Sequence, residues 1–233
     1  MGAQEVGRVV ALWRYPVKSM AAERLEEIDV SWAGFAGDRR WAFVRTTIPR
    51  SGFPWMTIRE KATMLHYRPR FVEPGRPDKS RTMVRTPAGE ELDVVDPGLA
   101  ASLGEGVRVI KQDRGAFDAM PLSLVTTQAI ADLGALVGVP LDPQRFRPNL
   151  LVETFGALES EWVGSVLRIG GAVMRADQPD ERCVVINVDP ETGERNPAIL
   201  RTVAAERSAC MGVYGSTVQP GRVAIGDLVV LEG

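Results

Sequence analysis

The sequence predicts a mainly β protein with a few helices, of the kind built from β-barrels or β-sandwiches. Short stretches rich in β-branched or alternating apolar residues recur along the whole chain of 233 residues, and turn residues separate them. The 23 glycines and 16 prolines are scattered throughout, as expected where many short strands must end. Two segments with the apolar spacing of a helix stand out against this background.

The predicted strands follow one another from the start of the chain to its end. Gly170-Gly171 lies between two of them and favours a hairpin turn, and Pro220-Gly221 and Gly226-Asp227 are also typical of turns. The predicted strands are residues 6–15, 25–32, 40–45, 82–86, 91–95, 107–111, 149–153, 166–169, 172–176, 183–189, 211–217, 223–225 and 228–231.

The two predicted helices have start and stop signals. The first begins after a cap at Thr126 or Thr127, carries its apolar residues on one face and ends near Gly138. The second, residues 198–207, follows Asn196-Pro197, which is an N-cap residue and then a proline at the first helical position.

The length of the chain suits one large domain or two small ones. A break in the strand pattern near residues 115–121 divides the chain into nearly equal halves. We therefore expect an N-terminal domain of residues 1–115 and a C-terminal domain of residues 116–233.

Composition and charge point to a protein of aqueous compartments. Hydrophobic residues make up 45% and charged residues 25% of the chain, which is ordinary for a globular protein. The formal net charge of -2 argues against a general nucleic-acid grip, which needs a strongly basic face. The start of the chain has no signal-peptide pattern, and no apolar stretch approaches the roughly 18 residues needed to cross a bilayer. With two cysteines, the expected location is cytoplasmic and no membrane partner is expected.

The supply of metal ligands is small. One histidine, His66, and two cysteines cannot make a structural zinc site with four Cys or His ligands, nor a four-cysteine iron–sulfur cluster. Phosphate-loop and dinucleotide fingerprints are absent, and Gly104-Glu105-Gly106 lacks the later glycine. Any redox metal must therefore bring most of its own ligands.

Cys183 is the first candidate for chemistry. It lies beside Arg182, and an adjacent guanidinium favours the thiolate, the form that acts as nucleophile and metal ligand. Burial as a small hydrophobic side chain is an equally valid interpretation of an isolated cysteine. For Cys210, which enters a strand, the core position is the expectation.

Polar residues at the ends of predicted strands form a second group of candidates. Tyr15-Pro16 ends the first strand and leaves Lys18 and Ser19 in a loop, where a cation and a hydroxyl can meet an anion. Strand alternation would direct Arg39 inward and Arg40 to water, although a structural pair of Asp38 with an arginine is an alternative.

Further candidates for binding an anion lie later in the chain. Arg147 and Asn149 offer a planar fork and an amide next to an apolar run, Arg59 adds a cation, and Thr126 stands at a helix start. Each also has a plain structural explanation, as a residue of a polar loop or as a helix cap.

Taken in order, these motifs resemble the MOSC superfamily, and more closely the two-part mitochondrial amidoxime-reducing components and their bacterial relatives. Residues 10–43 resemble the MOSC N-terminal β-barrel domain, and residues 117–233 resemble the MOSC β-barrel domain itself. The resemblance covers nearly the whole chain, and its motifs are specific as an ordered set. They are Tyr15-Pro-Val-Lys-Ser, Gly37-Asp-Arg-Arg-Trp, Arg145-Phe-Arg-Pro-Asn, Arg182-Cys-Val-Val-Ile-Asn-Val-Asp-Pro-Glu-Thr-Gly and Pro220-Gly-Arg-Val-Ala-Ile-Gly-Asp.

The resemblance implies a molybdenum cofactor, a pyranopterin that carries a dithiolene and a phosphate. Because the dithiolene supplies two sulfurs, the protein needs to add one soft ligand, and Cys183 matches the molybdenum-ligating cysteine of the family. The positions that match family residues around the phosphate, the pterin and the rest of the site are Lys18, Ser19, Arg39, Arg147, Asn149, Thr126, Arg182 and Tyr214.

The activity that the resemblance implies is reduction of N-hydroxylated compounds such as amidoximes and hydroxylamines, with Cys183 at the metal. Electrons are expected from a separate ferredoxin-like or cytochrome b5-like protein with its reductase, and no membrane anchor is expected. Asp189 either relays protons or caps a turn. Two alternatives stay open: a sulfur carrier with a persulfide on Cys183, and a cofactor-binding module without turnover.

Overall fold

The computed structural model of the chain describes residues 2–46 and 54–232. Its contacts divide into two compact units. The barrel unit consists of Met1–Trp13, Arg24–Ala36 and Ala119–Gly233, and the companion unit consists of Arg14–Glu23 and Gly37–Asp118. The predicted break near residues 115–121 thus coincides with the last passage of the chain from one unit to the other. The first 36 residues are shared between the units, whereas the sequence suggested a single N-terminal domain.

In the described part of the barrel unit, seven strands form a closed ring of hydrogen-bonded neighbours, which confirms the mainly β fold class and its barrel. The first strand closes the ring, because it pairs with the last strand on one side and with β11 on the other. In order round the ring, the strands are β11 (Leu150–Thr154), β10 (Leu122–Thr126), β14 (Cys210–Gln219), β13 (Ala172–Glu181), β12 (Val166–Ile169), β16 (Leu228–Glu232) and β1 (Gln4–Arg14).

Strands β10 and β11 are parallel, whereas the other neighbours round the ring are antiparallel. A parallel pair needs a crossover connection, and the helix between these two strands provides it. Inside the ring, apolar side chains from every strand are nearly inaccessible to water, for example those of Leu12, Leu124, Val152, Leu167 and Val213.

A small sheet of three strands adds to the same core, with Ile28 and Val30 buried in it. Its strands are β3 (Glu27–Ser31), β4 (Gly34–Phe35) and β15 (Gly221–Ala224). The predicted turn before the last strand is confirmed, since Gly226 has a φ of 93° and the Asp227 N–H donates to the Ala224 carbonyl. The hairpin turn at Gly170-Gly171 is confirmed by the pairing of β12 with β13.

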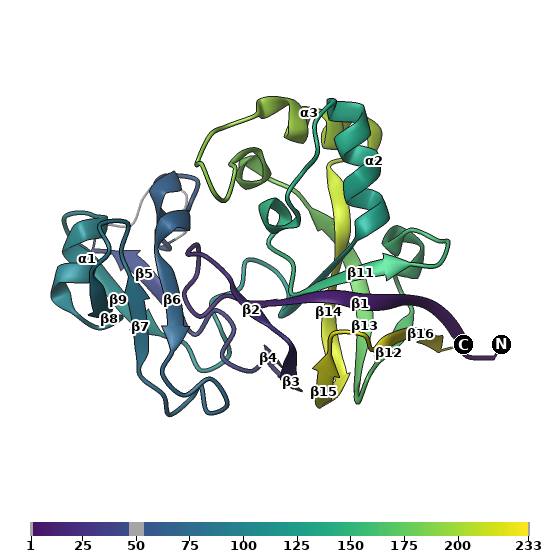
Figure 1. The fold of residues 1–233 in the computed structure, drawn as a ribbon, viewed down its shortest axis with the longest axis horizontal. Helices are drawn as coiled ribbons and strands as arrows, with labels where there is room; N and C mark the ends of the chain where they lie inside the picture. Colours follow the sequence, from purple (N-terminus) through teal and green to yellow (C-terminus); the bar gives the residue numbers. More distant parts are fainter. Residues whose placement is uncertain (1, 47–53, 233) are drawn as a thin grey trace. The chain divides into compact units, whose positions relative to one another are not determined.

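Both predicted helices are present and begin where the sequence indicated. In α2 (Thr127–Val137), the Thr126 hydroxyl accepts from the Ala129 N–H, and Gly138 ends the helix in the left-handed conformation. In α3 (Pro197–Glu206), the Asn196 side chain accepts from the Ala198 N–H. The two helices pack against each other, and Figure 1 shows them together beside the yellow strand β14. Three short 3-10 helices complete this unit: η2 (Pro143–Phe146), η3 (Glu159–Trp162) and η4 (Val184–Asn187).

The companion unit is built from two small sheets and a short helix around its own apolar core. The core includes Met20, Phe43, Met64, Val84 and Leu99. Its elements are β5 (Trp41–Arg45) paired with β9 (Val107–Lys111), the meander β6 (Arg68–Phe71), β7 (Thr82–Arg85) and β8 (Glu91–Asp93), the 3-10 helix η1 (Ala62–His66) and α1 (Pro97–Leu103). Strand β2 (Glu23–Leu25) follows β1 in the chain.

The predicted strand at residues 183–189 is wrong. This segment forms η4 and then a turn, with Ile186 and Val188 buried on the side that faces the rest of the unit. Its apolar run has no alternation to fix a strand, and the chain must reverse after β13. Strands β6 and β10 and helix α1 were not predicted, although Asp96 and Pro97 form a recognisable helix start.

No helix in the part of the chain that the structure describes is long and apolar enough to cross a membrane.

The seam between β1 and β11 is tight at Gly7, and this gives a testable prediction for barrel closure. A Cβ at Gly7 would lie 2.6 Å from the Glu153 carbonyl oxygen and 2.7 Å from Val152 Cγ1. Gly7→Ala should therefore lower the free energy of unfolding by about 1–3 kcal/mol, measured by urea denaturation. Gly156→Ala is the matched control, because open space surrounds Gly156. Equal stability of the two variants would contradict this account of the seam.

Candidate functional site

Cys183 lies where β13 has ended and η4 begins. Its backbone is extended, with a φ of −124°, and its carbonyl accepts from the Ile186 N–H at 3.2 Å. The residue is partly exposed, so the thiol is held at the boundary between core and solvent. Asn187 fixes the far end of η4, because its side-chain oxygen accepts from the Leu200 N–H of α3.

The guanidinium of Arg182 is almost fully buried and contacts three different segments. Its Nε donates to the Met211 carbonyl at 2.6 Å and its Nη1 donates to the Phe146 carbonyl at 2.8 Å. Its Nη2 forms an ion pair of 2.8 Å with Asp180, which is itself buried. The charge of Arg182 is thus shared with a carboxylate inside the protein, which gives Arg182 a structural task that the sequence analysis did not anticipate.

Asp189 caps the turn that follows η4. One of its carboxylate oxygens accepts from the N–H groups of Glu191 and Thr192, both at 2.9 Å, and the other pairs with Arg145 at 2.5 Å. Burial raises the pKa of Asp189, but these backbone donors and the Arg145 guanidinium outweigh it and hold the pKa below its usual value. A carboxylate held in its ionised form suits the turn-capping role better than proton relay.

The segment that carries Arg147 and Asn149 adjoins the cysteine segment through two contacts described above, those of Phe146 with Arg182 and of Arg145 with Asp189. Arg147 ends η2 in a left-handed conformation with a φ of 51°. The Asn149 side chain is buried, accepts from the Ser123 N–H and donates to the Trp13 carbonyl. It therefore links β10, β11 and β1 at one end of the barrel.

Thr126 is fully buried at the start of α2. Besides capping the helix, its hydroxyl donates to the carboxylate of Glu159, which also accepts from the Gly212 N–H at 3.0 Å. Tyr214 lies two residues further along β14, where it is partly exposed and opposite Ser123 and Gln178. Thr126 is thus a structural residue in this unit, and Glu159 is its unpredicted partner.

In the companion unit, two of the predicted cations pair with the carboxylate of Asp118, and the charge of a third, Arg39, also acts on it. Lys18 Nζ lies 2.7 Å from Asp118 Oδ1 and also donates to the Ala116 carbonyl at 2.7 Å. Arg59 lies 3.9 Å from the other oxygen of Asp118. Partial burial raises the pKa of Asp118, but Lys18 first, and then Arg59 and Arg39, lower it by more, so the pKa is below its usual value. The cluster of Lys18, Arg39 and Arg59 is called the cation cluster below.

Arg39 is held between an acid and aromatic rings. Its guanidinium pairs with buried Asp38 and lies 4.7 Å from the centre of the Tyr15 ring and 5.9 Å from that of Phe117. The alternative of a structural pair with Asp38 is therefore confirmed. The expectation that Arg40 faces water is wrong, because Arg40 precedes β5, pairs with Asp78 and leaves 13% of its side chain exposed.

Backbone conformation singles out the same positions. Among the described residues, five that are not glycine have positive φ, and three of them are predicted site residues: Ser19 (68°), Arg39 (49°) and Arg147 (51°). Left-handed conformations of such residues cost roughly 1 kcal/mol or more each and cluster at functional sites. In each unit this signal adds to the reasons for considering these residues, and it could not be read from the sequence.

Cys210 differs from Cys183 in its surroundings. It is partly exposed at the start of β14, opposite Glu181, rather than in the core as expected. Burial raises its pKa, and the nearby carboxylates of Glu181 and Asp180 add to the effect. The raised pKa favours the thiol form of Cys210 over the thiolate.

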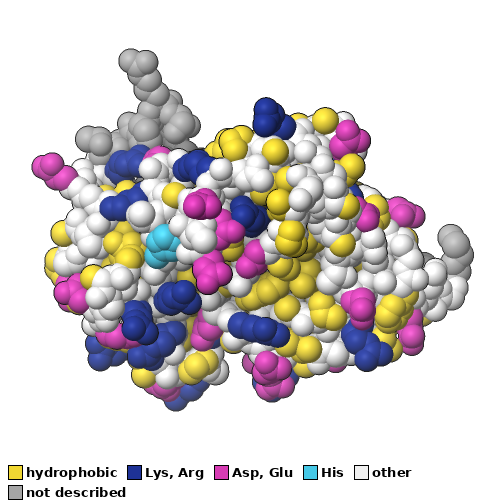
Figure 2. Space-filling model, turned by 45° about the horizontal axis from the view of Figure 1, so that its top comes forward, with side chains coloured by type: hydrophobic (Ala, Val, Ile, Leu, Met, Phe, Trp, Pro, Cys, Tyr) yellow, Lys and Arg dark blue, Asp and Glu magenta, His cyan; other side chains and the backbone are white. Residues whose placement is uncertain are grey.

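Two further observations on the described residues limit the type of site. No three His, Cys, Asp or Glu side chains gather there in a way that could hold a metal ion. On the face shown in Figure 2, basic and acidic side chains are interspersed, without the continuous basic surface of a nucleic-acid-binding protein.

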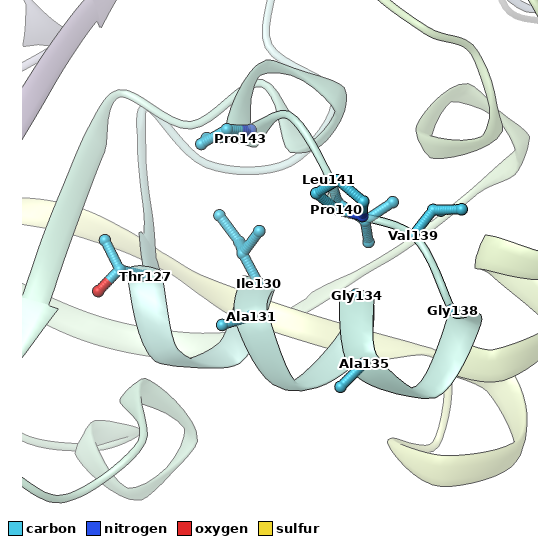
Figure 3. Close-up of a pocket in the computed structure, with 10 residues that line it drawn as sticks. All are labelled: Thr127, Ile130, Ala131, Gly134, Ala135, Gly138, Val139, Pro140, Leu141 and Pro143. Carbon is cyan, nitrogen blue, oxygen red and sulfur yellow. The ribbon is translucent and has the colours of Figure 1, made fainter.

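An apolar pocket of about 530 Å³ lies along α2 in the barrel unit. Figure 3 shows Ile130 of the helix facing Leu141 and Pro143 of the segment that follows it. Its lining includes Thr127 but neither Cys183 nor Arg147, so the pocket is separate from the candidate residues.

Comparison with known proteins identifies the family. Residues 111–230 match the MOSC domain, and residues 6–120 match the MOSC N-terminal β-barrel domain. The chain belongs to the MOSC family. A molybdenum cofactor sulfurase of Drosophila mojavensis is 26% identical over 277 residues, an alignment that covers 97% of this chain and 35% of that protein. The sulfurase of Drosophila erecta is 30% identical over 163 residues, an alignment that covers 60% of this chain and 21% of that protein. This MOSC protein thus spans about a third or less of the relatives it matches.

Solved structures agree on the fold. The YuaD protein from Bacillus subtilis superposes with a TM-score of 0.52 at 14% identity, over 98% of this chain and 96% of that one. A hypothetical protein of known structure gives 0.51 at 12% identity, over 98% of this chain and 70% of its own. At such identities the likeness shows the shared MOSC fold and nothing about activity.

The buried pair of Arg182 and Asp180 gives a prediction for stability. Arg182→Met removes the buried ion pair with Asp180 and both bonds to the Met211 and Phe146 carbonyls. The free energy of unfolding should fall by about 3 kcal/mol, measured by urea denaturation. In the matched control, Arg175→Met breaks a pair with Asp177 on the same strand in which the arginine side chain is 57% exposed, and it should cost less than about 1 kcal/mol. A difference of zero between the variants would refute the structural role of Arg182.

The lowered pKa of Asp189 predicts a pH-dependent contribution to stability. A carboxyl whose pKa is lower in the folded than in the unfolded state stabilises the fold above its unfolded pKa of about 4. The contribution disappears as the pH falls through the folded pKa. The stability difference between the wild type and Asp189→Asn should therefore be largest at pH 7 and shrink below pH ~4. Chemical denaturation over pH 3–7 measures it, and a difference independent of pH would contradict the assignment.

Proposed function

We propose that this MOSC protein binds a molybdenum cofactor and reduces N-hydroxylated compounds such as amidoximes and hydroxylamines. The observation that carries the proposal is the pairing of two features in one chain. One is a partly exposed cysteine, Cys183, which the sequence resemblance leads us to expect at the metal, and the other is the cation cluster, which suits a phosphate.

The donor set of the chain fits this cofactor. Among the described residues, no group of three protein side chains could hold a metal ion. A cofactor whose dithiolene brings two sulfurs does not need three ligands from the protein. Cys183 would add the protein's thiolate, a soft ligand suited to a metal already bound by sulfur. Lys18, Arg39 and Arg59 would hold the phosphate, and the left-handed Ser19 and Arg147 would present polar groups to the cofactor.

The overall reaction is a reduction by two electrons. An amidoxime takes up two electrons and two protons, its N–O bond breaks, and an amidine and water are released. When bound, the cofactor would supply the two-electron redox chemistry. The electrons would come from a separate redox protein, ferredoxin-like or cytochrome b5-like. Because its pKa lies below the usual value, Asp189 is a poor proton donor, so solvent water is the proposed source of protons.

The role of the chain in this reaction is positioning. Arg182 holds the segments of Phe146 and Met211 against the end of β13, and thereby fixes the backbone from which Cys183 projects. The thiol of Cys210, with its raised pKa, would not compete for the metal.

A second function is supported by the relatives named molybdenum cofactor sulfurases. In this alternative, Cys183 would carry a persulfide, accept its outer sulfur from a donor persulfide and pass it to an acceptor, which regenerates the thiol. A third possibility, a MOSC module that holds the cofactor without turnover, predicts bound molybdenum and no reduction with any donor.

The test compares two cysteine variants. Protein purified from cells should contain close to one molybdenum per chain and should reduce benzamidoxime with a chemical electron donor. Cys183→Ser should lower the turnover by at least about a hundredfold, because it removes the soft ligand. Cys210→Ser should leave both quantities unchanged.

Each alternative has its own outcome in the same experiment. Normal turnover by Cys183→Ser contradicts the proposal. Mass spectrometry that finds an additional sulfur on Cys183, in protein without molybdenum, favours the sulfur carrier. Full molybdenum content without turnover in the wild type favours the binding module.

A further inference from the structure

The cation cluster already holds an anion of its own. Lys18 contacts the carboxylate of Asp118 directly and Arg59 lies 3.9 Å from it, and the charge of Arg39 also acts on it. The charge of Arg39 is shared with Asp38, whereas Asp118 faces the remaining cations. Lys18 is buried, so its charge would be costly to leave without a nearby anion.

The position of Asp118 is set by the segment that precedes it. The Ala116 N–H donates to the Arg39 carbonyl, and the Ala116 carbonyl accepts from Lys18. Gly115 has a φ of 84°, and a Cβ there would lie 2.5 Å from the Phe117 ring. The chain thus bends at Gly115 and is tied to two residues of the cluster before it reaches Asp118.

The carboxylate of Asp118 is nevertheless the exposed member of the pair. Its side chain is 45% exposed, against 4% for Lys18. An anion arriving from solvent can therefore replace the carboxylate without unpacking Lys18, which keeps its bond to the Ala116 carbonyl.

We infer that Asp118 is a built-in counter-anion of the cation cluster. Its carboxylate occupies the cluster until a phosphate group displaces it. This inference deepens the proposed function, because the phosphate would be that of the bound cofactor. The carboxylate competes with phosphate and so lowers the affinity of the cluster for it. When no phosphate is bound, the carboxylate stabilises the cluster by reducing the repulsion between its cations. Asp118 is therefore a residue that tunes binding of the phosphate group rather than a catalytic one.

The test uses inorganic phosphate as the probe and needs no molybdenum. In Asp118→Asn the side chain keeps its size and loses its charge, so the Kd for phosphate, measured by isothermal titration calorimetry at low ionic strength, should fall about fivefold. The same variant should have a lower Tm than the wild type without phosphate, and added phosphate should restore most of the difference.

Asp78→Asn is the matched control, because Asp78 lies in the same unit, pairs with Arg40 and carries the same charge. A general effect of net charge would tighten phosphate binding equally in both variants and would overturn the inference. Unchanged or weaker phosphate binding by Asp118→Asn would overturn it as well. Should Asp118→Asn fail to fold, Asp118→Glu keeps the charge one methylene further out and should leave the phosphate Kd of the wild type within about twofold.

The outcome is separate from that of the proposed function. Tighter phosphate binding by Asp118→Asn in a protein that never contains molybdenum would support the counter-anion and reject the cofactor. Molybdenum bound through Cys183, with no effect of Asp118→Asn on phosphate binding, would support the cofactor and reject the counter-anion.

Discussion

The buried guanidinium of Arg182 organises the candidate residues of the barrel unit. Three of its nitrogens contact the end of β13, the segment before Arg147 and the start of β14, through Asp180, Phe146 and Met211. A planar, permanently charged fork suits this task, because one rigid group can fix several backbone segments at once. The position of Cys183 is a consequence, since its backbone directly follows the anchored residue.

The companion unit holds a cluster with an excess of positive charge, whereas Arg182 and Asp180 in the barrel unit balance each other. In this cluster the cations outnumber the acids, and burial of Lys18 is tolerated because Asp118 and a carbonyl face its ammonium group. A cluster of this kind is prepared for a multiply charged anion, since replacing one carboxylate by a phosphate increases the negative charge that faces it. The chain therefore holds a thiol suited to a soft metal and a cation cluster suited to phosphate, each built by local contacts.

Much of the fold could be predicted from the sequence, because its signals are local. Helix boundaries are one example: Thr126 and Asn196 are N-cap residues, and Gly138 ends a helix in the left-handed conformation, as predicted. Residues 183–189 were mistaken for a strand because an apolar run without alternation does not distinguish a strand from a buried turn. Closure of the barrel by β1 depends on pairing between segments that are distant in the sequence. It could therefore not be predicted from any local sequence pattern.

The candidate site was predictable only in part. Lys18, Arg39 and Arg59 are visible as cations in loops, and the structure gathers them around Asp118. Their acidic partner was missed because an aspartate in Phe117-Asp118-Ala119 carries no pattern of its own. Asp180 and Glu159 were missed for the same reason, since burial turns a common surface residue into a structural one, and burial depends on tertiary packing.

The proposed function depends on Cys183 as the protein's ligand to molybdenum. X-ray absorption at the molybdenum edge counts sulfur ligands directly, in the wild type and in Cys183→Ser. We expect three sulfurs in the wild type, two from the dithiolene and one from Cys183, and two in the variant. An identical sulfur shell in both proteins would contradict this assignment.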